Sequence, residues 1–267
     1  MDLGLKNKVV AITGGSSGIG EAVALAFAAE GALVAVCGRS QEKLDALKAK
    51  FDAAGFPLYT EALDVSDLPA LEGFVHHAAA WQGHLDVLIN NAGVNIRKYF
   101  EDYTPEEFDR IVATDMKAVF FGSQYAAAEM RKNSGGAIIN TSSFTSLIPS
   151  GNVGPYSAAK AAVNNMTAHM AASLAPDGIR VNAVIPGMTV TPLTEKNIAA
   201  HREQMVGNIS MRRLATPDDL VGAYLFLASE TMAGYVSGVS VIVAGAKLTT
   251  QDPHYGWKVR ESGGLKG

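Results

Sequence analysis

Cysteine is almost absent from this sequence of 267 residues. The single thiol, Cys37, excludes an internal disulfide and a metal site built from several thiolates. It lies in the apolar run LVAVC, so we interpret it as a buried small hydrophobic residue and not as a nucleophile. The six histidines, among them the adjacent His76 and His77, form no cluster with metal-ligand spacing, and no metal is expected.

Clustered positive charge is lacking as well. The 22 lysines and arginines are scattered, the 26 acidic residues outnumber them, and the formal net charge is −4. This distribution argues against a nucleic-acid partner. The first residues, MDLGLKNKVVAITGG, reach glycines before any apolar run is long enough for a signal sequence or a membrane span. We therefore expect a soluble, cytoplasmic protein that binds neither nucleic acid nor a membrane.

Linkers, internal repeats and low-complexity tracts are also missing, so residues 1–267 are predicted to form a single domain. The predicted strands are residues 8–13, 33–37, 57–63, 86–90, 137–142, 179–185 and 240–244. The predicted helices are residues 18–30, 41–53, 67–82, 104–131, 156–175 and 217–229. This alternation is typical of a doubly wound, Rossmann-type α/β fold with about seven parallel strands and helices on both faces of the sheet.

The first predicted strand leads directly into a glycine-rich stretch, TGGSSGIGEA. Gly14, Gly18 and Gly20 leave room for backbone amides and a helix N-terminus to approach a pyrophosphate. A plain glycine turn is the alternative, but the position between a strand and a helix favours a dinucleotide cofactor. The spacing is G-x-x-x-G-x-G and not the commoner G-x-G-x-x-G.

Three further motifs follow this glycine stretch in order: NNAG at 90–93, YSAAK at 156–160 and PGMTVT at 186–191. Together the four motifs resemble the short-chain dehydrogenase/reductase family over residues 5–245, and their agreement in register is far more specific than any one of them. The resemblance implies an NAD(P)-dependent oxidoreductase that interconverts a secondary alcohol and a carbonyl compound by hydride transfer. It also implies a homotetramer.

Tyr156 and Lys160 lie four residues apart, on one face of a predicted helix. A cation one helical turn from a phenol favours the phenolate, and hydride transfer needs a positioned acid/base group. By resemblance, Tyr156 is that group, and Lys160 tunes it and binds the nicotinamide ribose. The resemblance also assigns Ser143, thirteen residues before the tyrosine, to holding the substrate oxygen. Its neighbour Ser142 is expected to point back into the sheet.

One position departs from the family pattern. The family commonly has an asparagine in a stretch like VNLKGVF, where it supports a water relay to the lysine, but this sequence reads TDMKAVF with Asp115. A carboxylate there would hold Lys160 charged and would also oppose a nearby phenolate, and the sequence leaves open which effect dominates. Asp115 serving only backbone groups is a further alternative. We include it among the catalytic candidates.

The end of the second predicted strand indicates which dinucleotide is bound. NAD enzymes of this fold carry an acid there that accepts a hydrogen bond from the adenosine 2′-hydroxyl. Gly38 takes its place here, followed by Arg39 and Ser40, and this favours NADP over NAD. The glycine stretch opposes this choice, because it has Ser16 and Ser17 where some NADP enzymes of the family carry a second basic residue.

The resemblance assigns further contacts with the cofactor. Asp64 is expected at the adenine edge, Asn90 at the ribose side, Ile185 against the nicotinamide and Thr189 at its carboxamide. The predicted cofactor-binding residues are Gly14, Ser16, Ser17, Gly18, Ile19, Gly20, Arg39, Ser40, Asp64, Val65, Asn90, Ala92, Gly93, Tyr156, Lys160, Pro186, Gly187 and Thr189.

The substrate is less clearly indicated. Residues 190–213 fall where the family has a mobile substrate lid, and the stretch NIRKY at 95–99 and Asn152 are candidates for polar contacts at the rim. An acidic or polyhydroxylated carbonyl compound is one interpretation, and solvated surface side chains are the other. The C-terminal tail, residues 246–267, departs from the family and contains aromatic residues that suggest docking, for example onto a neighbouring subunit.

Two other functions remain open. A sensor or scaffold that binds NADP(H) without turnover is supported only by Asp115, and the intact Ser143, Tyr156 and Lys160 argue against it. The branch of the superfamily that acts on nucleotide sugars shares Tyr-x-x-x-Lys but usually has a G-x-x-G-x-x-G spacing, which this sequence lacks.

Overall fold

Seven strands form one parallel sheet in the order β3-β2-β1-β4-β5-β6-β7. In this computed structural model, which describes residues 2–133 and 135–250, the chain order reverses between β1 and β4. The strands are β1 (Val9–Thr13), β2 (Leu33–Gly38), β3 (Leu58–Ala62), β4 (Val87–Asn90), β5 (Gly136–Thr141), β6 (Ile179–Pro186) and β7 (Ser240–Val243). The predicted doubly wound parallel fold is confirmed.

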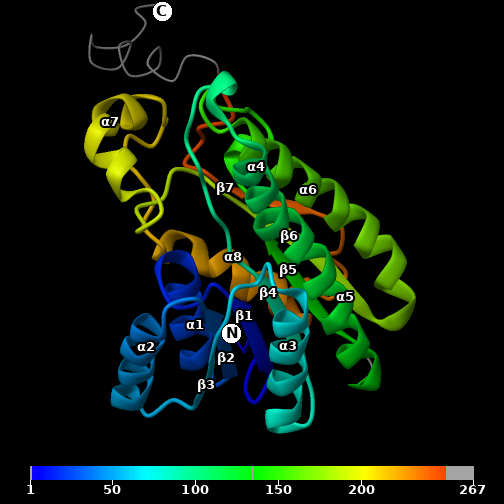
Figure 1. Cartoon of the computed structure of the whole chain (residues 1–267). Helices are drawn as coiled ribbons and strands as arrows, with labels where there is room; N and C mark the ends of the chain where they lie inside the picture. Colours follow the sequence, from blue (N-terminus) through cyan, green and yellow to red (C-terminus); the bar gives the residue numbers. More distant parts are fainter. Residues whose placement is uncertain (1, 134, 251–267) are drawn as a thin grey trace, which may run out of the picture.

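Helices cover both faces of the sheet (Figure 1). The helices are α1 (Gly18–Ala29), α2 (Gln41–Ala54), α3 (Leu68–Gln82), α4 (Pro105–Val112), α5 (Ala118–Met130), α6 (Gly154–Leu174), α7 (Glu195–Gly207), α8 (Asp218–Ala228) and α9 (Glu230–Ala233). One face packs against α1, α2 and α8 through Val10 and Ile12 of β1. The other face packs against α3, α5 and α6 through Val9 and Ala11. This alternation explains why β1 is buried along its whole length.

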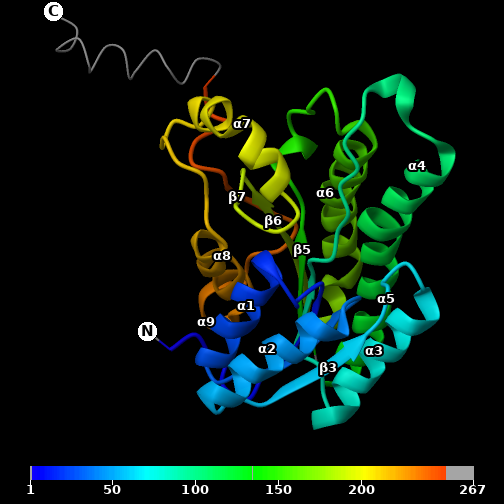
Figure 2. The same cartoon turned by 60° about the vertical axis from the view of Figure 1, so that its left-hand side comes forward.

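The structure differs from the predicted elements in the helix expected over 104–131 and in the segment that follows β6. The single helix expected over 104–131 is divided into α4 and α5 by a π-helical turn, Ala113–Lys117, which carries Asp115. The lid segment contains α7, which was not predicted and which bends at His201, where the backbone is not helical. Figure 2 shows α7 apart from the two helical layers. Of the C-terminal tail, residues 251–267 lie outside the described part of the chain.

Cys37 is fully buried in β2, and burial raises the pKa of its thiol, as expected for a hydrophobic core residue. Within residues 2–133 and 135–250, no helix is both long and apolar enough to span a membrane. Over the same residues, no three His, Cys, Asp or Glu side chains are grouped closely enough to hold a metal ion.

Candidate active site

A cleft with a cavity volume of about 310 Å³ opens at the carboxyl ends of the parallel strands. It extends from the turn after β1 to the segment after β6. The predicted site residues that line it are Gly14, Ser16, Ser17, Gly18, Ile19, Arg39, Ser40, Asp64, Val65, Ala92, Gly93, Ser143, Tyr156, Lys160, Pro186, Gly187 and Thr189. Three others, Gly20, Asn90 and Asp115, are buried behind this lining.

The turn between β1 and α1 has the shape that a dinucleotide requires. Gly14 has a φ of +64°, and a Cβ added to it would lie 2.7 Å from the Cα of Ala92. The helix α1 begins at Gly18, and its N-cap residue, Ser17, makes no side-chain capping hydrogen bond. The first amides of α1 are therefore open to an anion at the positive end of the helix dipole. These residues fit a pyrophosphate group.

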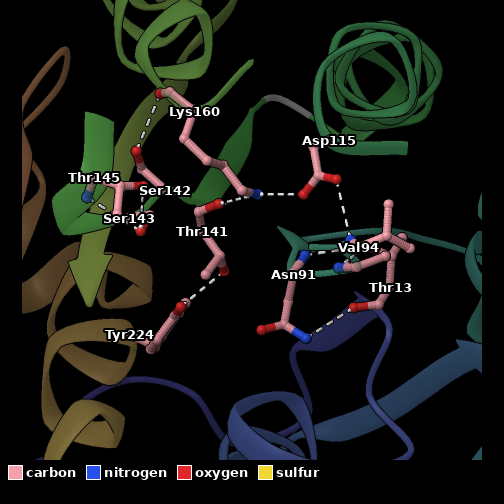
Figure 3. Close-up of polar contacts among 11 residues, drawn as sticks. Thr13, Asn91, Val94, Asp115, Thr141, Ser142, Ser143, Thr145, Lys160 and Tyr224 are labelled. Carbon is pink, nitrogen blue, oxygen red and sulfur yellow. Dashed lines mark hydrogen bonds and ion pairs between the residues drawn. The ribbon is translucent and has the colours of Figure 1, made fainter. Parts of the chain in front are cut away.

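The NNAG stretch after β4 holds this turn in place (Figure 3). Thr13 Oγ1 accepts hydrogen bonds from the backbone amides of Asn91 and Ala92, at 3.0 and 3.2 Å. The side-chain amide of Asn91 donates to the carbonyl oxygen of Gly14 at 3.0 Å. A Cβ on Gly20 would lie 2.5 Å from Asn91 Nδ2, so the third glycine makes room for this contact and does not face the cleft.

Asn90 serves the sheet and does not line the cleft. Its side chain is buried, and Nδ2 donates to Ser123 Oγ at 3.0 Å and to Asn140 Oδ1 at 2.9 Å. The amide thus joins β4 to β5 and α5, instead of making the ribose-side contact that we expected. Asn91 was not among the predicted site residues, although it belongs to the NNAG motif.

The end of β2 presents cations to the cleft. A Cβ on Gly38 would lie 2.7 Å from Ser16 Oγ, so a larger residue at this position would require the Ser16 side chain to move. Arg39 and Lys43 line the cleft beside it. The guanidinium of Arg39 approaches the Asp64 carboxylate no closer than 4.0 Å, and both side chains are about half exposed. Lys43 was missed in the sequence, although its place in the first turn of the following helix, α2, is a usable signal.

Ser143, Tyr156 and Lys160 meet at the other end of the cleft. The Lys160 ammonium is buried, donates to the carbonyl oxygen of Thr141 at 3.0 Å and lies 5.6 Å from the centre of the Tyr156 ring. Its ion pair with Asp115 Oδ1 spans 3.2 Å (Figure 3). The π-helical turn between α4 and α5 places Asp115 behind this group, in keeping with the frequent use of such turns at functional sites.

A family model described as short chain dehydrogenase matches residues 8–202, which is well over half of the chain. The chain belongs to the short-chain dehydrogenase/reductase family. A 3alpha-hydroxysteroid dehydrogenase from Mediterraneibacter gnavus is 40% identical over 247 residues, covering 91% of this chain and 97% of that protein. As a member of this family, the protein is an NAD(P)-dependent oxidoreductase that acts on CH–OH groups.

Solved structures of dehydrogenases share the fold over almost the whole chain. A short-chain type dehydrogenase/reductase from Mycobacterium marinum is 34% identical with a TM-score of 0.88, covering 92% of this chain and 97% of that chain. A gluconate 5-dehydrogenase from Burkholderia cenocepacia J2315, solved in complex with NADP and tartrate, is 29% identical with a TM-score of 0.87. The respective coverages are 92% and 96%.

The charges in this dehydrogenase favour a protonated tyrosine. Burial raises the pKa of the Tyr156 hydroxyl, the Lys160 charge lowers it, the Asp115 carboxylate raises it again, and a hydrogen bond with Ser143 lowers it. The net pKa is above its usual value, so the phenolate that we expected from the lysine alone is not favoured. The Asp115 carboxylate, in turn, raises the pKa of Lys160 against the effect of burial. This dehydrogenase therefore holds a charged lysine beside a neutral phenol.

The segment after β6 closes the nicotinamide end of the cleft. Thr189 lines it, whereas Ile185, which we expected against the nicotinamide, is 1% exposed and is not part of the lining. The hydroxyl of Thr194 donates to the carbonyl oxygen of Thr189 at 2.6 Å and so fixes the start of the segment that was expected to form a lid. The lining includes the lid residues Thr191, Pro192, Leu193 and Thr194.

Proposed function

We propose that this protein is an NADP(H)-dependent oxidoreductase that interconverts a secondary alcohol and a carbonyl compound, with Tyr156 as the acid/base group. The observation that carries the proposal is the position of Tyr156, Ser143 and Lys160, which line the same cleft as the glycine turn. A dinucleotide bound across the cleft would bring its nicotinamide ring to these three side chains. The names of the relatives point to different substrates. The proposal therefore names the type of reaction and the cofactor but no particular substrate.

NADP is the cofactor that the charges at the end of β2 support. Gly38 places no carboxylate at the end of β2, and Arg39 and Lys43 offer two positive charges to a 2′-phosphate. Lys43 supplies the second basic residue that the glycine stretch lacks. The gluconate 5-dehydrogenase with bound NADP is a further support, because its structure resembles this one closely.

When bound, the dihydronicotinamide supplies a hydride to the carbonyl carbon of the substrate. Ser143 would donate a hydrogen bond to the carbonyl oxygen and orient it, and the protonated Tyr156 would deliver its proton to the same oxygen. The product is then a secondary alcohol, and the phenolate that remains is stabilised by the charged Lys160. In the reverse direction Tyr156 takes the proton from the alcohol. The ammonium of Lys160 is also our candidate for binding the nicotinamide ribose hydroxyls.

The family analogy leads us to propose a homotetramer in the cytoplasm. A cofactor-binding sensor without turnover is the second candidate, and only the Asp115 carboxylate beside Tyr156 favours it.

The test is reduction by the purified protein of a panel of ketones, keto sugars and keto acids, followed through NADPH oxidation. We expect turnover of at least one compound, and a loss of about 10²- to 10⁴-fold in Tyr156→Phe, which keeps the NADPH affinity. Near-normal turnover by Tyr156→Phe would show that the acid/base assignment is wrong. NADPH binding without turnover of any compound would favour the sensor.

A further inference from the structure

Arg97 is a cation in the cleft that the reaction described above does not use. It lies on the segment after β4, lines the same cleft as Ser143 and Tyr156, and is half-buried. The Arg97 charge lowers the pKa of the Tyr156 hydroxyl, with which it shares the cleft lining. The phosphate-binding features lie elsewhere, at the glycine turn and the end of β2, so Arg97 is not needed for the cofactor.

The position of Arg97 is fixed by a second loop. Its Nη1 donates to Asn152 Oδ1 at 3.3 Å, and the backbone amide of Lys98 donates to the Asn152 carbonyl oxygen at 3.1 Å. The Tyr103 hydroxyl donates to the carbonyl oxygens of Ile96 and Asn152, at 2.7 and 3.2 Å. Residues 96–103 and 152 thus form one hydrogen-bonded unit that holds the guanidinium at the cleft.

No acidic side chain within the described residues forms an ion pair with Arg97. The neighbouring Lys98 has its own partner, because its ammonium lies 2.7 Å from Glu107 Oε1. Among the described residues, the cleft lining contains one carboxylate, that of Asp64, which lies beside Arg39. Partial burial removes some of the water that would solvate the guanidinium, which costs free energy. An ion pair with a negative group of a ligand would compensate this cost.

A second group at this end lacks a partner. Asn95 Oδ1 is buried, has no hydrogen-bond partner among residues 2–133 and 135–250, and belongs to a side chain that lines the cleft. Such an acceptor is matched by a hydroxyl or another donor on a ligand. Asn95 and Arg97 line the same cleft as Ser143 and Tyr156, so a ligand held there could offer a donor to Asn95 Oδ1 and an anion to Arg97.

We propose that Arg97 binds a carboxylate of the substrate, and that the compound reduced in this cleft is a small hydroxylated oxo acid. This assignment rests on the proposed oxidoreductase function. A planar carboxylate matches the guanidinium fork, and a single guanidinium balances its single charge. A phosphate monoester carries close to two charges and would leave one of them unpaired.

The test compares 5-oxohexanoate and 5-dehydrogluconate with their methyl esters, and dihydroxyacetone phosphate with dihydroxyacetone, as substrates of the full chain with NADPH. We expect kcat/KM for each carboxylic acid to exceed that of its ester by on the order of 10- to 100-fold. In Arg97→Gln this ratio falls toward one while the NADPH affinity is retained. Lys98→Gln, which removes a neighbouring charge outside the cleft lining, is the matched control and keeps the ratio.

Equal kcat/KM for acids and esters, or an unchanged ratio in Arg97→Gln, would overturn the proposal and leave the oxidoreductase function standing. A higher kcat/KM for dihydroxyacetone phosphate than for both acids would show that the bound anion is a phosphate and not a carboxylate. Turnover of no compound would count against the oxidoreductase function itself. In that case, calorimetric titration of 5-dehydrogluconate and of its ester into the NADP complex tests the anion site directly. Binding of the acid but not of the ester, with loss of this binding in Arg97→Gln, supports the site. Any other result rejects it.

Discussion

The carboxylate of Asp115 meets two donors at once. Oδ2 accepts a hydrogen bond from the backbone amide of Val94 at 3.0 Å, and Oδ1 faces the Lys160 ammonium at 3.2 Å. An asparagine, which the family commonly has here, offers one oxygen and one NH₂ group, so its NH₂ would face one of these donors. The electrostatics of this pair bear on the question that the sequence left open: an Asp115 carboxylate raises the pKa of both Lys160 and Tyr156, while burial raises the pKa of Asp115 itself.

We therefore expect Asp115→Asn to change the pH dependence of alcohol oxidation. Oxidation needs the phenolate of Tyr156, and the Asp115 charge raises the Tyr156 pKa, so its removal moves the rise of kcat/KM to lower pH. The variant also leaves a buried donor without an acceptor, which lowers the free energy of unfolding by about 1–3 kcal/mol. A pH–rate profile and urea unfolding measure the two effects. Asp109→Asn removes an exposed acid from α4 as the control, and a profile in which Asp115→Asn behaves like it would contradict this prediction.

The side chains of Arg39 and Lys43 are expected to set the cofactor preference. Arg39→Ala removes the guanidinium that pairs with a 2′-phosphate, so the NADPH affinity falls by about 10- to 100-fold while the NADH affinity changes little. Lys43→Ala shifts the ratio in the same direction. Fluorescence titration with both cofactors measures it, with Lys48→Ala, an exposed residue paired with Asp52, as the control. An unchanged NADPH-to-NADH ratio in Arg39→Ala would refute the NADP assignment.

At the scale of elements, the turn between β1 and α1 depends on glycine for two separate reasons. The positive φ of Gly14 disfavours any other residue, and an added Cβ would overlap the backbone of Ala92. We expect Gly14→Ala to lower the free energy of unfolding by at least about 2 kcal/mol and to abolish tight NADPH binding.

Gly73 in α3 is the matched control for Gly14. A Cβ there would meet no atom closer than His77 Cε1 at 3.8 Å, and the residue lies inside a helix. Gly73→Ala should therefore raise the free energy of unfolding by about 0.5–1 kcal/mol. Chemical unfolding measures the change in the free energy of unfolding for both variants. An equal change in Gly14→Ala and Gly73→Ala would mean that a side chain at Gly14 does not strain the turn.

The same elements show what the sequence was able to predict. The five inner strands and the glycine turn follow from apolar runs, because a buried parallel strand leaves a strong local signal, whereas the edge strands β3 and β7 are only partly buried. The π-helical turn at Asp115 leaves none, since one extra residue in a helical turn does not interrupt the apolar pattern of the surrounding helix. The lid helix α7 was missed because it buries only Ile198, so its apolar pattern is weak.

At the scale of the whole molecule, the site is assembled from strand ends that are far apart in the sequence. The motifs predicted Ser143, Tyr156 and Lys160 together, because the resemblance carries their spacing. Lys43 and Arg97 belong to no motif, and only the order of the strands brings them to the cleft. Asn90 and Asn91 are adjacent in sequence, and their opposite orientation along the end of β4 decides which one faces the glycine turn.

The association of whole chains is expected to use the outer face of α5 and α6, which cover the same side of the sheet. On α6 this face carries small exposed residues, among them Ala161, Ala168 and Ala172, which permit close approach of a second helix. Light scattering should give a mass about four times 28.0 kDa for the natural chain. Ala168→Arg places a bulky charge on this face and should lower the mass to that of a dimer or less, whereas Ala53→Arg on the exposed side of α2 should not. A monomeric natural chain, or a tetramer that persists in Ala168→Arg, would contradict this arrangement.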